Sequence, residues 1–248
     1  MRFTVTPKWI PTPIQGNRKF PLPPDYDDLS PSARREARIN AVCQQKSPED
    51  FVLTWAWFRY HYLRYLPLGV WYQEPYYPSP PMHYSFIHDV QSQQRNALIF
   101  PRAFAKSTLI EEIILLWAIS RPYFTVLLLK SVLDFVQASF LRLQEQLEDN
   151  ERILEDFGEL RAKRGVAGKM WNLSRMKLTN GFSLVGRSIK ARLVGLRPRY
   201  IFADDVEFDQ KTLDSSGGFN PEFTELFRSI FFEHLMPMLE KGAGATIS

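Results

Sequence analysis

The sequence is short of the residues that build disulfide-rich, zinc-binding and membrane-spanning proteins. Its 248 residues contain one cysteine, Cys43, and four histidines. A single thiol excludes a disulfide scaffold and is typical of a reducing compartment. These residues also lack the spacing of zinc ligands. The apolar runs fall far short of the ~20 residues of a membrane span, and the first residues have no signal-peptide core.

Glycine and acidic residues are each missing from one long stretch. None of the 12 glycines lies between Gly69 and Gly158, although a phosphate-binding loop usually needs them. The segment Arg161–Ala203 has no Asp or Glu and 11 Lys or Arg, so it carries +11 while the rest of the chain sums to −7. Such a block is suited to phosphates of a nucleotide or of DNA. The alternative is a solvated face paired with the acidic segment Glu145–Glu159.

The N-terminal third is rich in proline and aromatic residues. Residues 1–50 indicate an extended arm with one short helix over Ser32–Gln44. Aromatic residues then recur at helical spacing, which predicts a buried helix face, with a base-stacking platform or a partner surface as alternatives. They are Phe51, Trp55, Phe58, Tyr62 and Tyr65. A proline-rich linker, Pro75–Pro81, follows.

After Pro81 the pattern alternates between helices and buried strands, which predicts an α/β fold with a mostly parallel sheet. Helices are expected over 83–92, 106–120, 132–147, 151–160 and 221–239. Strands are expected over 96–100, 124–129, 200–203 and 245–248, with a hairpin of 173–178 and 182–185 around Asn180-Gly181.

The turn between the strand ending at Phe100 and the helix starting near Lys106 occupies the position of a P-loop. It contains Pro101-Arg102-Ala103-Phe104-Ala105-Lys106-Ser107-Thr108. In such a loop the backbone surrounds phosphates, the lysine neutralises them and the serine hydroxyl binds Mg²⁺. Phe100 and Ala105 stand where the usual pattern has glycine. The alternative is therefore an ordinary helix start.

Two acids after the strand Tyr200–Ala203 form a candidate Walker B motif. Asp204, at the carboxyl end of the strand, is expected to hold the metal. Asp205 is expected to orient and deprotonate the attacking water, and Glu207 is a weaker candidate for that role. The alternative is that the acids cap a turn. The loop and the acids together predict a nucleotide site.

Hydrolysis also needs positive charge at the transferred phosphoryl group. Arg102 lies in the loop and is placed to sense the γ-phosphate. Arg192 and Arg197 precede the acids and are candidates to act from a neighbouring subunit. Each arginine could instead serve an ion pair or the DNA backbone.

In combination, these motifs resemble the ATPase region of the large subunit of tailed-phage terminases, the motor that packages DNA into the capsid. The resemblance runs from about Pro81 to the C-terminus. The turn at 101–108 is similar to the family's Arg-containing variant of Walker A, which tolerates alanine before the lysine. The other matches, in family order, are Pro81-x-His83, Lys130-Ser131 through Ala138 to Asn150, Trp171, Arg197-Pro198 and a coupling motif, Gly244–Ser248, with Thr246.

The resemblance implies a P-loop NTPase of the RecA/ASCE-like class, with a mostly parallel sheet flanked by helices. Residues 1–80 would be an N-terminal arm with an aromatic helical segment, and residues 81–248 the ATPase core. The implied cofactors are ATP and Mg²⁺. The implied partners are double-stranded DNA, a portal protein, a small terminase subunit and identical subunits in a ring. The implied location is the host cytoplasm and, transiently, the procapsid portal, but not the mature virion.

The sequence departs from the family at three points. Arg199 stands where an acid often follows Arg-Pro, and Asp205 replaces the more common Glu. The family's nuclease domain is not expected in these residues, and the ATPase core is expected to stop before its last strands. Two other functions stay open: a non-hydrolysing assembly or DNA-binding module built on a decayed P-loop, and another P-loop DNA motor such as a helicase.

Overall fold

The structure of the chain is a computed structural model. It describes residues 22–45, 47–63, 79–92, 95–97, 104–162, 170–189, 191, 196–206, 225, 228, 229, 233, 237 and 244–247. The chain divides into two compact units. The helical unit comprises residues 1–93, 108–122 and 142–161, and the sheet unit comprises residues 94–107, 123–141 and 162–248.

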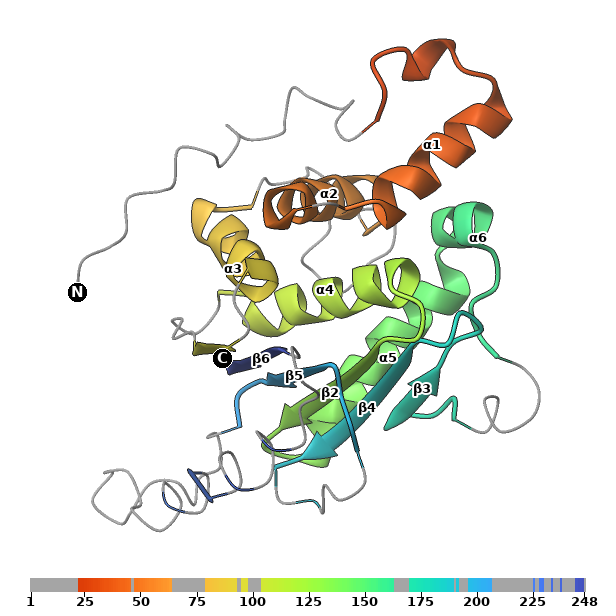
Figure 1. Ribbon diagram of the computed structural model, residues 1–248. Coiled ribbons are helices and arrows are strands. Elements are labelled where there is room, and N and C mark those ends of the chain that lie inside the picture. Colours follow the sequence, from red (N-terminus) through yellow and green to blue (C-terminus); the bar gives the residue numbers. More distant parts are fainter. Residues whose placement is uncertain are drawn as a thin grey trace. The chain divides into compact units, whose positions relative to one another are not determined.

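The helical unit contains the N-terminal helices, parts of two later helices and the whole of a third (Figure 1). Serine caps explain where the first two helices begin: the Ser30 and Ser47 side chains accept hydrogen bonds from the amides of Ala33 and Asp50, and each serine precedes a proline. The elements are a 3₁₀ turn (Tyr26–Asp28), α1 (Pro31–Cys43), α2 (Pro48–His61), α3 (Pro81–Ser92), most of α4 (Lys106–Ser120), the end of α5 (Leu133–Asp149) and α6 (Glu151–Phe157).

The aromatic face of α2 is buried, as its spacing predicts. Phe51, Trp55 and Phe58 are at most 1% exposed. The Trp55 ring meets that of Tyr84 edge to face with centroids 5.6 Å apart, and Phe51 lies 6.4 Å from Trp117 on α4. These residues therefore form the core of the helical unit. Predicted Tyr65 lies outside the described residues.

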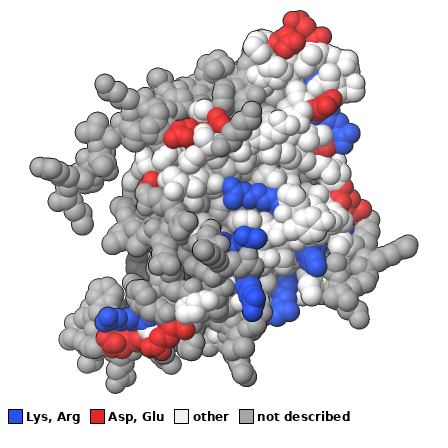
Figure 2. All heavy atoms as spheres, viewed as in Figure 1, with Lys and Arg blue, Asp and Glu red and all other residues white. Residues whose placement is uncertain are grey.

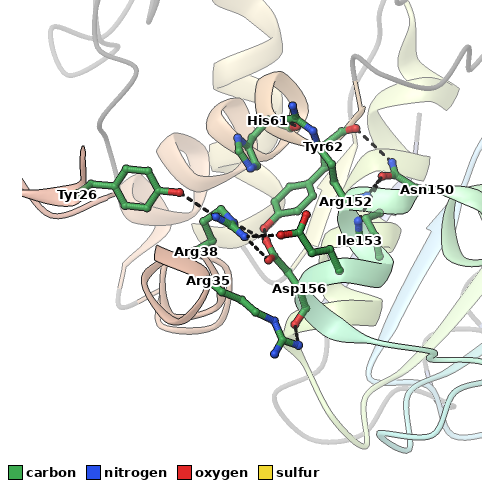
Figure 3. A network of polar contacts seen from close by, with 10 residues as sticks. Tyr26, Arg35, Arg38, His61, Tyr62, Asn150, Arg152, Ile153 and Asp156 are labelled. Atoms are coloured by element: carbon green, nitrogen blue, oxygen red, sulfur yellow. Dashed lines mark hydrogen bonds and ion pairs between the residues drawn. The ribbon is translucent and has the colours of Figure 1, made fainter. Parts of the chain in front are cut away.

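A buried polar network joins α1, α2 and α6 in the same unit (Figure 3). The Arg38 guanidinium donates to both carboxylate oxygens of Asp156, at 2.7 and 2.6 Å. The Tyr62 hydroxyl donates to the same carboxylate at 2.7 Å, and Arg38 also donates to the Tyr26 hydroxyl at 2.9 Å. The hydrogen bond to Asp156 raises the pKa of Arg38, and burial raises that of Tyr62. The buried carboxylate is thus paired on two sides.

Within the described residues, the sheet unit contains six strands in the order β1-β6-β5-β2-β4-β3. All neighbouring pairs are parallel except the edge pair β3–β4, which is antiparallel. The predicted α/β fold with a mostly parallel sheet is therefore confirmed. The strands are β1 (Arg95–Ala97), β2 (Thr125–Lys130), β3 (Arg175–Lys177), β4 (Ser183–Ser188), β5 (Tyr200–Ala203) and β6 (Gly244–Ile247).

The first half of α5 lies against one face of this sheet. A Cβ at Gly186 on β4 would stand 2.2 Å from Val136 and 2.6 Å from Phe140, so only glycine admits the helix this close. The centre of the sheet is apolar: Val126, Leu128 and Phe202 have no exposed surface. The buried side chains of β2 and β5 fit the continuous apolar runs from which these two parallel strands are predicted.

The β3–β4 hairpin is confirmed, but its loop is longer than the predicted two residues. The Leu178 amide donates to the Phe182 carbonyl and the Gly181 amide to the Leu178 carbonyl, which leaves three residues in the loop. Only Gly181, at φ 86°, has a left-handed backbone, whereas a two-residue type I′ turn needs two such residues.

The other predicted elements lie within a few residues of those found, and α4 and β5 have the predicted bounds. Most of the predicted helix 221–239 lies outside the described residues, as do 98–100 of the first strand. Among the helices that the structure describes, none has the length and apolar character needed to cross a membrane.

Candidate active site

Parallel strands bring their carboxyl ends to one edge of the sheet, where the predicted site residues lie. The end of β5 supplies Asp204 and Asp205, the end of β2 supplies Lys130, and the start of α4 supplies Lys106 and Ser107. Predicted Arg102 and Ala103 lie outside the described residues, as do Arg192 and Glu207. Phe104, Ala105 and Thr108 are described and partly exposed.

Ala105 adopts the backbone conformation that a glycine would hold without strain. Its φ is 55°, in the left-handed region, and α4 begins at the next residue, Lys106. For a residue with a Cβ this conformation costs roughly 1–2 kcal/mol. Ala105 stands where the usual P-loop pattern has its second glycine, and its backbone has the positive φ that glycine favours.

Lys106 contacts the second acid of the candidate Walker B pair. Its Nζ lies 2.9 Å from Oδ1 of Asp205. The lysine side chain is 18% exposed and the carboxylate 45%. Asp205 also has a left-handed backbone, with φ 47°. The structure therefore brings together the two residues predicted to neutralise phosphate and to activate water.

The first acid, Asp204, is wholly buried and forms an ion pair with a different lysine. Its Oδ2 lies 2.7 Å from Nζ of Lys130, whose side chain is 7% exposed. The Asp204 amide also donates to the Leu129 carbonyl at 2.9 Å, which extends the β5–β2 ladder by one step. Leu128 pairs with Phe202 in this ladder, so Lys130 and Asp204 stand side by side on the same face of the sheet.

The oxygen donors at this edge fit a magnesium ion that is carried by a nucleotide. Mg²⁺ is usually held by one or two carboxylates together with substrate phosphates. Asp204 and the Ser107 hydroxyl are such donors, and the described residues contain no cluster of three or more His, Cys, Asp or Glu that could hold a metal alone. In addition, the Ser131 hydroxyl, beside Lys130, is buried without a hydrogen-bond partner among the described residues.

Thr246, the predicted coupling residue, contacts the strand that carries the acids. Its hydroxyl lies 2.6 Å from that of Tyr200, and Thr246 has no exposed surface. A Cβ at Gly244 would stand 2.3 Å from the Tyr200 ring, so glycine at this position makes room for the tyrosine. Arg197, a candidate trans arginine, has an exposed side chain.

Sequence reasoning missed the partners of these residues. Lys130 is part of a motif that resembles the terminase family, but the sequence predicts no ion pair for it. Tyr200 is predicted only as a strand residue. The signal for Lys130 is a cation directly after four buried strand residues, since such a group needs a buried acid as its partner. The identity of that acid depends on the strand order, which the sequence alone does not provide.

A cationic face lies on the β3–β4 hairpin. Arg175 pairs with Val185 and Lys177 with Ser183, so these two cations and Arg187, two positions after Val185, project from the same side. Burial and the charge of Arg175 lower the pKa of Arg187. None of the ion pairs among the described residues involves the three. Figure 2 shows Lys and Arg gathered over these strands.

Comparisons with known proteins find similar folds among the solved structures of phage terminases. The crystal structure of the HK97 bacteriophage large terminase is 15% identical, with a TM-score of 0.47 over 87% of this chain and 37% of that one. A mutant of the Thermus phage P74-26 large terminase ATPase domain is 17% identical, with a TM-score of 0.39 over 66% of this chain and 62% of that one. The chain thus spans less than two thirds of either. Both are large terminases, the family that the motifs resemble. No protein-family model and no curated protein matches the sequence.

Proposed function

We propose that this chain is the ATPase part of a terminase large subunit, which hydrolyses ATP to move double-stranded DNA into a procapsid. One observation carries the proposal. A lysine at the start of a helix, directly after a left-handed turn, contacts the second of two acids at the end of a nearby parallel strand. Phosphate-binding and water-activating groups are thereby within reach of one ligand.

Each side chain has a role in this proposal. Lys106 leaves Asp205 when a triphosphate arrives and neutralises its phosphate oxygens. Asp205, once released, orients the attacking water and accepts its proton. Arg102 contacts the γ-phosphate. Ser107 and Asp204 would hold Mg²⁺, which would supply positive charge to the phosphates.

The partners follow from the same proposal. DNA phosphates are expected on the cationic face of the hairpin, and a portal protein and a small terminase subunit are the expected protein partners. Identical subunits form a ring, in which Arg192 or Arg197 reaches the nucleotide of a neighbour. Thr246 couples hydrolysis to movement. The expected location is the host cytoplasm and, transiently, the procapsid portal, but not the mature virion.

The test is ATP hydrolysis by the chain with Mg²⁺ and double-stranded DNA at high protein concentration, which favours ring formation. Lys106→Ala and Asp205→Ala should each lower kcat by about 100-fold or more. Glu145→Gln, exposed on α5, is the control and should retain activity. The proposal fails if the wild-type chain hydrolyses ATP no faster than the two variants.

The second candidate function is a module that binds ATP without hydrolysing it. The observation in its favour is the strained Ala105 in place of glycine. This module would bind ATP tightly in a DNA-loaded ring and release no phosphate. Equilibrium binding of a fluorescent ATP analogue, measured beside phosphate release, separates the two functions.

A further inference from the structure

Both acids of the candidate site form ion pairs with lysines. Asp205 holds Lys106 at 2.9 Å, and Asp204 holds Lys130 at 2.7 Å. The four side chains therefore sum to zero charge. A hard dication binds where negative charge is in excess, so this arrangement gives Mg²⁺ little reason to bind alone.

The two ion pairs differ in how easily they can open. Lys106 and Asp205 are partly exposed, so water can replace either partner when a phosphate attracts the lysine. Lys130 and Asp204 are 7% and 0% exposed, and both belong to neighbouring strands of one ladder. Separating them would leave a buried charge without its partner, which is strongly unfavourable. Lys130 therefore stays at Asp204 whether or not a nucleotide is present.

We propose that Lys130 keeps divalent cations off Asp204 until a nucleotide supplies the additional phosphate ligands. Lys130 is thus a positioning residue: it acts through Asp204 and touches no reacting atom. Its charge makes metal binding conditional on nucleotide, so that the metal and the triphosphate enter together. This inference rests on the proposed function only in taking Asp204 as a metal ligand.

The test uses the intact chain without nucleotide and needs no activity. Thermal unfolding is followed as MgCl₂ is raised, and Mn²⁺ binding is followed by electron paramagnetic resonance. The wild-type midpoint should not respond to Mg²⁺, and Mn²⁺ should stay free. Lys130→Met should unfold at lower temperature and bind Mn²⁺. Its midpoint should rise by roughly 5–10 °C when Mg²⁺ reaches about 100 times its Kd.

Three further variants complete the test. Lys130→Arg keeps the charge and should behave like the wild-type chain. Asp204→Asn should bind no Mn²⁺. Lys130→Met/Asp204→Asn removes both partners, so it should be more stable than Lys130→Met without metal and lose the response to Mg²⁺.

The inference is overturned if Lys130→Met folds but gains no response to Mg²⁺ or Mn²⁺, or if the wild-type chain responds equally. It is also overturned if Lys130→Met stays unfolded at every Mg²⁺ concentration while the double variant folds. In one further outcome, Lys130→Met responds to metal but the wild-type chain does not hydrolyse ATP. This outcome would support the inference and count against the proposed function alone.

Discussion

Two residues of the candidate site have backbones that their side chains disfavour. Ala105 and Asp205 both lie in the left-handed region, at φ 55° and 47°. Ala105 precedes the lysine of the loop, and Asp205 is the acid that this lysine contacts. Such strain persists only where the surrounding structure imposes it, and it is concentrated at functional sites.

Ala105→Gly should therefore stabilise the chain. Glycine adopts a positive φ without a clash, and the gain should be on the order of 1 kcal/mol after its larger unfolded-state entropy is subtracted. Urea unfolding should show a higher midpoint with an unchanged slope. Ala138→Gly within α5 is the matched control and should lose about 1 kcal/mol. Equal losses in the two variants would mean that Ala105 carries no strain.

At this scale, residue type and spacing predict the main groups of the candidate site, and the structure brings two of them together. A lysine at a helix start and paired acids after an apolar strand have few other uses together, which is why Lys106 and Asp205 can be named from the sequence. The lysine that pairs with each acid cannot be named from the sequence, because each of these contacts joins segments far apart in the chain. The same holds for the hydrogen bond between Tyr200 and Thr246.

Among the elements, α4 illustrates what an apolar pattern predicts and what it leaves open. Its bounds follow from the sequence, and every residue from Leu109 to Ile119 is buried. A helix that is apolar on all sides is expected to be surrounded. The pattern does not reveal how its two acidic residues are satisfied. Glu111 pairs with Arg142, and Glu112 accepts from Trp55 Nε1 at 2.8 Å with Arg59 at 3.2 Å.

Glu112 should make stability depend on pH. Burial raises its pKa, opposed by Arg59 and Trp55. The folded chain then holds a proton that the unfolded chain has already lost, so stability falls as pH rises from the ordinary carboxyl range to the raised pKa, and this dependence ends above it. Glu112→Gln has no carboxyl group at this position, so its stability lacks this pH dependence.

The measurement is urea unfolding of both chains at a series of pH values. The stability of the wild-type chain relative to the variant should fall by up to about 1.4 kcal/mol per pH unit within that window. Two curves that run parallel at every pH would mean that the carboxyl group titrates alike in the folded and unfolded chain.

Across the whole molecule, charge is divided by sign along the sequence. The net charge of +4 conceals a stretch of +11 and a remainder of −7. Folding places part of the basic stretch on the hairpin, where Arg175, Lys177 and Arg187 lie on one face. Like charges held together destabilise the folded chain unless an anion binds them, and a DNA backbone is the anion of the proposed function.

Replacing these three residues by glutamine should weaken binding to duplexes of unrelated sequence alike. The slope of log K against log salt should become shallower by about 0.9 for each DNA phosphate that the hairpin no longer neutralises. Fluorescence anisotropy over a range of salt concentrations measures this slope. Arg228→Gln, at an exposed position beside Glu225 and Glu233, is the control and should leave the slope unchanged.

An unchanged slope in the triple variant would mean that DNA does not bind this face. If self-association fell instead, as followed by sedimentation, the occupant would be an acidic surface of a second copy. Basal ATP hydrolysis without DNA should be the same in the triple variant and the wild-type chain, so failure of this prediction is separable from failure of the proposed function.

The position of strand β6 in the sheet determines when the sheet can be completed. Among the described strands, β1 pairs only with β6, and β6 separates it from β5. A ribosome completes β1 and β5 well before it reaches residues 244–247, so these two strands, which precede Lys106 and the acids, cannot be joined by strand hydrogen bonds until that late segment is made. A nascent chain interrupted before Gly244 would carry both halves of the motif without the strand that holds β1 and β5 in register. The site should therefore form after synthesis of β6, in a slow step set by contacts distant in sequence.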